Sequence, residues 1–459
     1  MNAKRFEKYR SAAHFPPTDC SPPPLKTSRY LFLQGQIGRF FSDLGVSLDR
    51  NGHTVRRINF NSGDRLFWQL PGAVDFTGSA AQWPDFLQRH LTAWNITDLI
   101  LFGDCRPLHK AAISLAHRLD IQTHVFEEGY LRPEFVTLEE GGVNGNSRLP
   151  RDAAFYLQAA SCLPDWGAGE SIPASFSRRA AEDVLYNLST AMGSWRFPHY
   201  RSHRPWHPFV EYAVGARRLP LKVFAQRKTE GQIERIVNGA CPYFLFPLQL
   251  DADSQIRFHA PEGGMTAAIQ NAIHSFARHA DNHALLVLTE HPLDYSPVDL
   301  GQAIAKIAAA MGISRRVVFL RGGSPPALIL KARGMVTVNS TIGITALTAN
   351  IPVITLGTAI YDMAGLTCQD GLDAFWQQPQ APQPRLFDAF RRVLAARTQI
   401  NGGFYSAEGI AKAVAGAALR LEQLAAKRQT LPLHAEHPQH VAEAQLWSPP
   451  EPTPQTMSA

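Results

Sequence analysis

The chain has 459 residues, of which 45% are hydrophobic, and a formal net charge of +6 at pH 7. This length predicts two domains plus tails, and this hydrophobic content excludes a largely disordered chain. No apolar run reaches the roughly 18–20 residues that span a bilayer, and the N-terminus lacks the apolar stretch of a signal peptide, so we expect a cytoplasmic protein. Five singly placed cysteines argue against a disulfide framework or a zinc cage.

A Pro-rich arm opens the chain, and we predict that residues 1–28 are disordered. From Tyr30 onwards, short apolar stretches alternate with stretches of helical spacing. In chain order these are YLFLQG, GRFFSDLGVSLDRNG, HTVRRINF, WPDFLQRHLTAW, TDLILFG, PLHKAAISLAHRLD and IQTHVFEEG. Such alternation is typical of a βαβ series. It predicts a parallel sheet covered by helices in a first domain over residues 29–170.

The alternation then lapses in a basic and aromatic segment, and we predict that residues 171–236 form a helical connection. Ten Lys and Arg residues between Ser177 and Glu230 are interleaved with aromatic side chains, including Trp195 and Trp206. An anionic membrane surface, an anionic substrate or nucleic acid would suit such a segment, and so would a solvated linker. The segment has no RNA-binding signature, so we expect no nucleic-acid partner.

A second βαβ series follows over residues 237–425. Its apolar stretches are CPYFLFPLQL, LLVLTEHP, VVFLRG, GMVTVNST and IPVITLG, with helical stretches such as MTAAIQNAIHSFARHA between them. Beyond it the chain becomes rich in proline, and we predict a disordered tail over residues 426–459. The predicted fold class is therefore α/β, with two Rossmann-like doubly wound domains joined by a helical segment.

In open parallel sheets, ligands bind beyond the carboxyl ends of the strands. Polar residues and glycines gather at these predicted ends. In the first series they are Gln34, Gly35, Gln36, Gly38, Gly103, Asp104, Glu127, Glu128 and Tyr130; in the second they are Gln249, Asp251, Asp253, Glu290, His291, Arg321, Asn339, Ser340, Thr341 and Gly343. This is more than solubility requires, and it indicates a ligand cleft between two domains.

Several of these residues can have either a structural or a functional role. Asn339, Ser340 and Thr341 precede a helix, where they can cap it or hold an anion. His291 is structural or faces a phosphate, and no second ligand stands at a metal-site spacing from it.

Glu127 and Glu128 alternate along a strand, so only one of them faces a shared cleft. A glutamate in a water-poor cleft can serve as general acid or base, whereas a structural salt bridge to Arg132 is the other reading.

Motifs spread over residues 29–370 resemble a known family. They are LFLQGQIGRFF, VRRINFNSGD, FEEGYLRPEFVTLEEGGVNGNS, PLQLDADSQI, EHPLD and VTVNSTIGITAL with PVITLGTAIYDMAGLT. These motifs resemble the capsule polysaccharide biosynthesis/export proteins of Gram-negative bacteria, and among them the single-module starter β-Kdo transferases of ABC-transporter-dependent capsules. The resemblance implies a GT-B-like pair of Rossmann domains and a retaining transfer of Kdo from CMP-Kdo to lyso-phosphatidylglycerol.

The resemblance also implies roles for individual residues. Asp253 resembles the family's nucleophile, with Asp251 as the neighbour that can be confused with it, and Glu128, or else Glu127, resembles the general acid/base. The nucleotide-sugar side would consist of His291, Pro292, Ser340, Thr341, Asn339, Gln249, Gln255 and Gly343. The acceptor side would consist of Gln34, Gly35, Gly38, Tyr130 and Arg132.

We therefore expect an enzyme that needs no metal or cofactor and uses an anionic phospholipid acceptor. It would lie on the cytoplasmic face of the inner membrane, held by basic residues and Trp195 or Trp206, and act with the capsule synthesis and export complex. DAD at 251–253 is formally a metal-binding DxD, but we interpret it as the nucleophile motif. Two alternatives stay open: a sugar-nucleotide epimerase of similar two-domain fold, and a non-catalytic export or scaffold component.

Overall fold

A computed structural model describes residues 27–164, 169–173, 175–202, 206–251, 254–292, 294, 299–322 and 325–430. Most of the arm predicted over 1–28 and of the tail predicted over 426–459 lies outside the described residues, as does Asp253. Residues 426–430 belong to the last described helix. Residues 27–420 make up one compact unit, which contains both sheets and both cavities described below.

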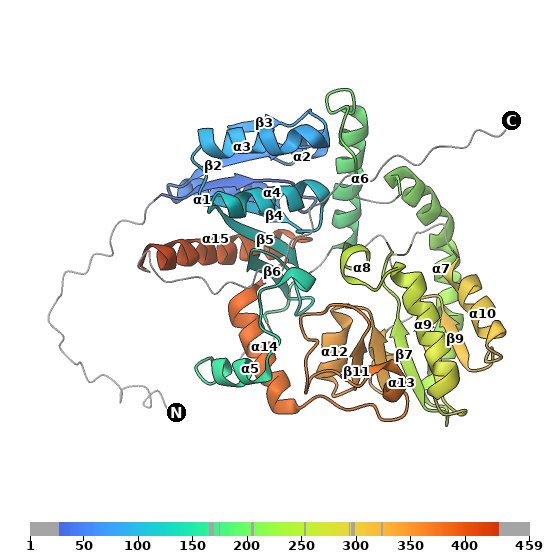
Figure 1. The fold of residues 1–459 in the computed structure, drawn as a ribbon. Helices are drawn as coiled ribbons and strands as arrows, with labels where there is room; N and C mark the ends of the chain where they lie inside the picture. The colour runs from blue at the N-terminus through green and yellow to red at the C-terminus, as the bar shows by residue number, and fades with distance from the viewer. Residues whose placement is uncertain are drawn as a thin grey trace, which may run out of the picture. The chain divides into compact units, whose positions relative to one another are not determined.

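The first sheet has seven strands in the order β12-β6-β5-β4-β1-β2-β3 (Figure 1). The strands are β1 (Arg29–Phe32), β2 (Thr54–Asn59), β3 (Ala73–Asp75), β4 (Asp98–Phe102), β5 (Gln122–Glu128), β6 (Phe135–Glu140) and β12 (Gln399–Asn401). Strands β1 to β5 run parallel to one another, as the alternating pattern predicts. The sheet is nevertheless mixed rather than purely parallel, because β6 and β12 are antiparallel to their neighbours.

Helices of the first half include those expected from the sequence. They are α1 (Phe40–Arg50), α2 (Ser62–Leu66), α3 (Trp83–Ala93), α4 (Pro107–Arg118) and α5 (Ala153–Ala160). The α1 helix ends at Asn51-Gly52 as predicted, and Gly52 takes the left-handed backbone conformation, with φ at +86°, that favours glycine. Two long helices, α6 (Phe176–Met192) and α7 (Pro208–Val237), occupy the predicted helical connection.

The second sheet has five parallel strands in the order β11-β10-β7-β8-β9. They are β7 (Tyr243–Pro247), β8 (Leu285–Thr289), β9 (Val317–Leu320), β10 (Gly334–Thr337) and β11 (Val353–Thr355). The helices are α8 (Ser254–His259), α9 (Gly264–His279), α10 (Leu300–Ala310), α11 (Pro325–Ile329), α12 (Ile342–Thr348), α13 (Gly371–Phe375) and α14 (Pro384–Thr398). Two α/β sheets thus confirm the predicted fold class.

Each sheet has its own core. In the first, Leu31, Leu99 and Val125 pack with Trp83, which is fully buried. In the second, Phe244 and Phe276 meet Trp376 edge to face at 5.0 and 5.3 Å between ring centroids. None of the helices in the described part of the chain combines the length and the apolarity needed to cross a bilayer.

The chain returns to the first sheet after α14. Residues 399–401, which the sequence placed in the second domain, form β12 and pair with β6. Buried Gln399 holds this return in place: its Oε1 accepts hydrogen bonds from the backbone N–H groups of Tyr130 (2.9 Å) and Leu131 (3.2 Å), and its Nε2 donates to Thr137 Oγ1 at 3.0 Å. The segment that carries Tyr405 and α15 (Ala407–Thr430) follows β12.

Replacing Gln399 by leucine should destabilise the protein. The change leaves two buried backbone N–H groups without an acceptor, at a cost of about 1–3 kcal/mol for each. Chemical denaturation should show the lower midpoint, while Gln378→Leu, at an exposed glutamine, should leave it almost unchanged. Equal midpoints for Gln399→Leu and wild type would contradict this account of the return.

Candidate functional site

About half of the residues predicted at the strand ends line one of two cavities. The first, which we call the α6 cavity, has a volume of about 490 Å³ and lies between the ends of β1, β4 and β5 and one side of α6. The second, which we call the His291 cavity, has a volume of about 520 Å³. It lies beside the ends of β7 and β8, residues 340–348 and the turn after β5. Gln34, Gly35 and Glu128 line the first cavity, and His291, Ser340 and Thr341 line the second.

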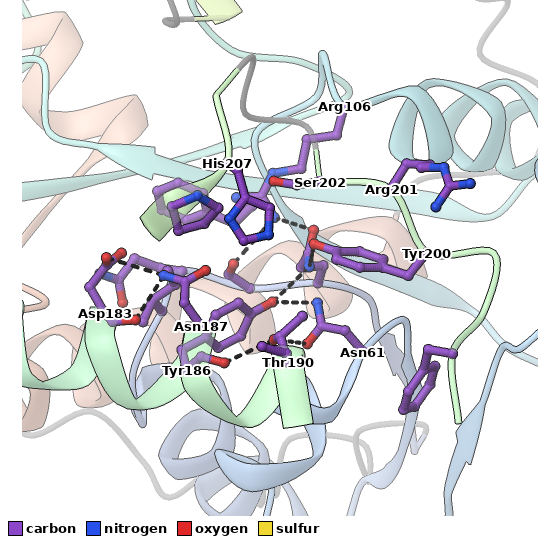
Figure 2. Close-up of a pocket in the computed structure, with 18 of the residues that line it drawn as sticks. Asn61, Arg106, Asp183, Tyr186, Asn187, Thr190, Tyr200, Arg201, Ser202 and His207 are labelled. Atoms are coloured by element: carbon purple, nitrogen blue, oxygen red, sulfur yellow. Dashed lines mark hydrogen bonds between the residues drawn. The ribbon is translucent and has the colours of Figure 1, made fainter. Parts of the chain in front are cut away.

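The Tyr186 hydroxyl joins α6 to the first sheet at the α6 cavity (Figure 2). It accepts hydrogen bonds from Gln34 Nε2 (2.8 Å) and Asn61 Nδ2 (2.7 Å) and donates to Asp64 Oδ1 (3.0 Å). Burial raises the pKa of Tyr186 well above its ordinary value, so the phenol keeps the proton that it donates. Gln34 also accepts from Arg106 Nη1 at 2.9 Å, which brings a partly buried guanidinium to the same site.

Polar groups from α6 project towards this cavity. Figure 2 shows Asp183, Tyr186, Asn187 and Thr190 on one side of the helix, facing Tyr200, Arg201 and His207. Asp183 Oδ2 accepts hydrogen bonds from the Tyr212 hydroxyl (2.6 Å) and Asn187 Nδ2 (3.2 Å). The cavity can therefore bind a polar molecule through amides and hydroxyls, and its arginines favour an anionic one.

Glu128, like Asp183, is a carboxylate that lines the α6 cavity. Its Oε1 accepts a hydrogen bond from the Tyr405 hydroxyl, and the Arg179 guanidinium lies 4.4 Å from the centroid of the Tyr405 ring. Burial raises the pKa of Tyr405, so the phenol stays protonated as a donor. Tyr405 comes from the segment after β12, and its contact with Glu128 therefore depends on the return of the chain to the first sheet.

Glu127 lies on the other face of the sheet, as alternation along β5 requires. Its Oε1 accepts from the backbone N–H of Glu128 at 3.1 Å, and a Cβ on Gly103 would lie 3.5 Å from its Oε2. Among the described residues, those that line the two cavities include Glu128 but not Glu127.

Gly35 and Gly38 shape the loop after β1. A Cβ on Gly35 would lie 2.7 Å from Cδ2 of Phe41, so the backbone passes too close to this ring for a side chain. Gly38 has φ at +129°, a conformation that side chains disfavour. Packing at position 35 and the backbone conformation at position 38 therefore explain why both residues are glycine. Gly35 also lines the α6 cavity.

The His291 cavity combines an imidazole, hydroxyls and guanidinium groups. His291 and Pro292 follow β8, Ser340 and Thr341 follow β10, and Arg132 comes from the turn after β5. Arg391 of α14, which the sequence did not single out, also lines the cavity. Tyr130 and Arg132, predicted on the acceptor side, lie here and not with Gln34 in the α6 cavity.

Three predicted nucleotide-side residues support the site rather than line the two cavities. Gln249 and Asn339 pair reciprocally, because Gln249 Nε2 donates to Asn339 Oδ1 (2.9 Å) and the Asn339 backbone N–H donates to Gln249 Oε1 (3.1 Å). Asn339 Nδ2 also donates to the backbone oxygen of Gln255 at 3.0 Å. These bonds join the ends of β7 and β10 to α8.

Gly343 is required by a close approach. A Cβ at this position would lie 2.2 Å from the Tyr361 hydroxyl, which donates to the backbone oxygen of Ser340 at 2.6 Å. Gly343 therefore lets Tyr361 hold Ser340 in place.

Of the two aspartates of the DAD motif, only Asp251 is among the described residues. Asp251 is exposed, and its Oδ1 accepts a hydrogen bond from the backbone N–H of Met265 at 3.2 Å, so it caps the N-terminus of α9. Asp253 lies outside the described residues. An asparagine at position 251 would keep the capping acceptor.

Sequence reasoning missed several residues of the α6 cavity, among them Asn61, Arg106, Tyr186, Asn187 and Tyr405. The basic and aromatic segment was a partial signal, because Tyr200 and Arg201 belong to it and line the cavity. The pairing of Tyr405 with Glu128 spans 277 positions of the chain and leaves no local pattern.

Beneath Tyr130 lies a buried carboxyl group. The Tyr130 hydroxyl donates to Glu139 Oε1 at 2.6 Å and accepts from the backbone N–H of Asn144 at 2.6 Å, and the Ser147 hydroxyl donates to the other oxygen of Glu139. Burial raises the pKa of Glu139 to about 7, although these hydrogen bonds oppose the shift.

The two α/β sheets, the first mixed and the second parallel, and their cavities define a protein with two Rossmann-like α/β domains. A family model described as capsule polysaccharide biosynthesis protein matches residues 97–405. The capsule polysaccharide export protein KpsS of Escherichia coli is 35% identical over 387 residues, which cover 83% of this chain and 98% of KpsS. The chain therefore belongs to the capsule polysaccharide biosynthesis family.

Two further similarities were found. The capsule polysaccharide modification protein LipB of Neisseria meningitidis serogroup B is 33% identical over 390 residues, covering 82% of this chain and 91% of LipB. Among solved structures, the β-Kdo 2,7 transferase of Thermosulfurimonas dismutans KpsC covers 86% of this chain and 99% of its own, with 12% identity and a TM-score of 0.41.

Replacing Glu139 by glutamine should change how stability depends on pH. The folded-state pKa of about 7 lies above the ordinary 4.5, so between these values the folded state binds more protons and the free energy of unfolding falls as pH rises. Glutamine removes this fall, worth about 3 kcal/mol at 1.36 kcal/mol for each pKa unit.

Urea unfolding of both proteins across this pH range would measure the effect. Below about pH 4.5 the carboxyl is protonated in both states, so the difference between the proteins should become constant there. A difference that stays constant over the whole range would contradict the raised pKa of Glu139.

Proposed function

We propose that this member of the capsule polysaccharide biosynthesis family is a retaining β-Kdo transferase. It would move Kdo from CMP-Kdo to a lyso-phosphatidylglycerol acceptor and so start the linker of the capsular polysaccharide. The observation that carries the proposal is Glu128, a carboxylate held by the hydroxyl of a partly buried tyrosine at a cavity that contains arginines. Family membership and the motifs shared with starter transferases support the choice of sugar and donor.

The two cavities would divide the substrates between them. We assign the acceptor to the α6 cavity, where Arg106, Arg179 and Arg201 suit a phosphodiester head group and the amides and hydroxyls suit a glycerol. We assign the nucleotide phosphate to the His291 cavity, where His291, the hydroxyls of Ser340 and Thr341, and Arg391 would neutralise the negative charge that develops on the departing CMP.

Retention requires two displacements at the anomeric carbon. In the first, the Asp253 carboxylate forms a bond to C2 of Kdo while the bond from C2 to the phosphate oxygen breaks, and CMP leaves with the electron pair. In the second, the acceptor hydroxyl attacks C2, the bond to Asp253 breaks, and Glu128 takes the hydroxyl proton. The scheme uses no metal or cofactor, and its nucleophile lies outside the described residues.

The acceptor implies where the protein works. A lyso-phosphatidylglycerol lies in the leaflet of a membrane, so we propose that the protein binds peripherally to the cytoplasmic face of the inner membrane. Basic residues near an anionic leaflet would each contribute about 1 kcal/mol. The capsule synthesis and export complex would then take over the product.

Mass spectrometry of a fluorescent lyso-phosphatidylglycerol analogue tests this function. Wild type incubated with CMP-Kdo generated in place should make the acceptor heavier by Kdo. Asp253→Asn should abolish the gain, whereas Asp251→Asn should keep it, because asparagine retains the cap of α9. No mass gain with wild type, despite bound CMP, would contradict the proposal, and loss of activity in Asp251→Asn alone would move the nucleophile to Asp251.

Substitutions at Glu128 and Tyr405 test the base. Glu128→Gln should lower kcat by about 10²–10⁴-fold, the usual contribution of general base catalysis. Tyr405→Phe should lower kcat by about 10- to 100-fold, since a hydrogen bond to a charged group is worth about 1.5–3 kcal/mol. Both variants should bind CMP as wild type does in calorimetry.

Tyr156→Phe is the matched control for Tyr405→Phe. Tyr156 is a tyrosine that is more deeply buried than Tyr405, and its hydroxyl has no hydrogen-bond partner among the described residues. This control should leave kcat unchanged. An unchanged kcat in Glu128→Gln would rule out Glu128 as the base.

A second function is favoured by the names of the relatives, one of which is called an export protein and the other a modification protein. Under this alternative the chain is a non-catalytic component of capsule export. Tight binding of CMP without any transfer to lipid would favour it.

A further inference from the structure

Exposed apolar side chains are concentrated around α6. Of the fifteen large hydrophobic residues that are exposed in the described part of the chain, nine lie between positions 176 and 210. Five of them form what we call the α6 stripe: Val184 (46% exposed), Leu185 (49%), Leu188 (45%), Met192 (72%) and Trp195 (79%). Isolated exposed hydrophobic residues are ordinary, but a gathering of this size marks an interaction surface.

The spacing of the stripe places it on one side of the helix. Val184, Leu185, Leu188 and Met192 stand at positions i, i+1, i+4 and i+8, which share a face of an α-helix. Tyr186 and Thr190, which face the α6 cavity, are each two residues from Leu188 and so lie about 160° away from it around the helix, at 100° per residue. The polar side of α6 faces the cavity, and its apolar side is therefore exposed to solvent.

Arginines lie at both ends of the stripe. Arg178 is seven residues before Leu185 and so lies on the same side, and Arg196 follows Trp195 at the other end. Each also pairs with a carboxylate, Arg178 with Glu182 and Arg196 with Asp75, and stays 32% and 46% exposed. The α6 acids Glu182 and Asp183 lie outside the arc of the stripe.

We propose that the α6 stripe inserts into the interface of an anionic phospholipid bilayer. An apolar helix face with tryptophan at one end and arginines at its borders has the composition of helices that lie in a membrane interface. Arginines attract the anionic head groups, while the apolar side chains enter the acyl boundary. The occupant is thus a lipid surface, because the guanidinium groups of Arg178 and Arg196 stay partly exposed beside their carboxylate partners, where they can contact anionic head groups.

The stripe also connects the membrane to the α6 cavity. Its last residues, Met192 and Trp195, flank Ser194 in the chain, and Ser194 lines the cavity. The inference rests on the proposed function in that a lipid acceptor has to pass from the leaflet into this cavity. Binding of the stripe to vesicles can nevertheless be measured without any donor sugar.

Flotation with vesicles made of equal parts phosphatidylcholine and phosphatidylglycerol tests the stripe. The wild-type chain should float with these vesicles. Leu185→Glu combined with Leu188→Glu should lower the bound fraction at least about tenfold, because it removes two apolar anchors and adds two charges that anionic lipid repels. Leu157→Glu combined with Leu330→Glu is the matched control, at leucines 48% and 70% exposed outside the stripe, and should float as wild type.

Three results would overturn the proposal. They are wild type that does not float, stripe variants that float as well as wild type, and stripe variants that turn a wild-type dimer into a monomer, which would make the stripe an interface between copies. Equal binding to pure phosphatidylcholine would overturn the role of anionic lipid. Thermal denaturation should show that the variants remain folded.

Transfer to a water-soluble acceptor distinguishes the role of the stripe in membrane binding from the catalytic activity. Stripe variants should retain this transfer and lose transfer to lipid in vesicles. A wild type that floats through the stripe but transfers no sugar would refute the proposed function and leave the membrane surface standing.

Discussion

The Tyr186 hydroxyl is the interaction on which the rest of the site depends. A phenol has one proton to donate and two lone pairs to accept with, and here all three are used by Asp64, Gln34 and Asn61. Since these partners follow β1 and β2, a helix from the middle of the chain is held in a fixed rotation against the first sheet. That rotation turns the polar side of α6 into the cavity and its apolar side outwards. Loss of a partner would leave a buried polar group unsatisfied, so the arrangement has little freedom to slip.

The sequence predicted much of the fold because local signals were strong. Buried strands such as β4 and β7 are continuous apolar runs, and Asn51-Gly52 marks the end of α1. The antiparallel strands were harder to predict from the sequence. The β12 strand has three residues, and it becomes a strand only by pairing with β6, more than 250 positions earlier. No local periodicity records a pairing of that kind.

The site was predictable to the extent that it follows the ends of strands. Glu128, His291, Ser340 and Thr341 were found in this way, and all four line a cavity. Tyr186 and Tyr405 were not found, because their place at the α6 cavity comes from helix rotation and chain return. Arg106 was missed although it lies in the loop after β4, where only Gly103 and Asp104 were singled out. Gln249 and Asn339 show the opposite case: polar residues at strand ends whose hydrogen bonds are made to each other.

Both outer strands of the first sheet, β3 and β12, are only three residues long. An outer strand offers its unpaired N–H and C=O groups to any passing chain, and short outer strands limit how many are on offer. The β6 strand, twice as long, would be an open border if the chain stopped before residue 399. The return of the chain thus has a second consequence, besides bringing Tyr405 to Glu128. Because β12 pairs with the edge of β6, other copies of the chain cannot add a strand to that edge and aggregate.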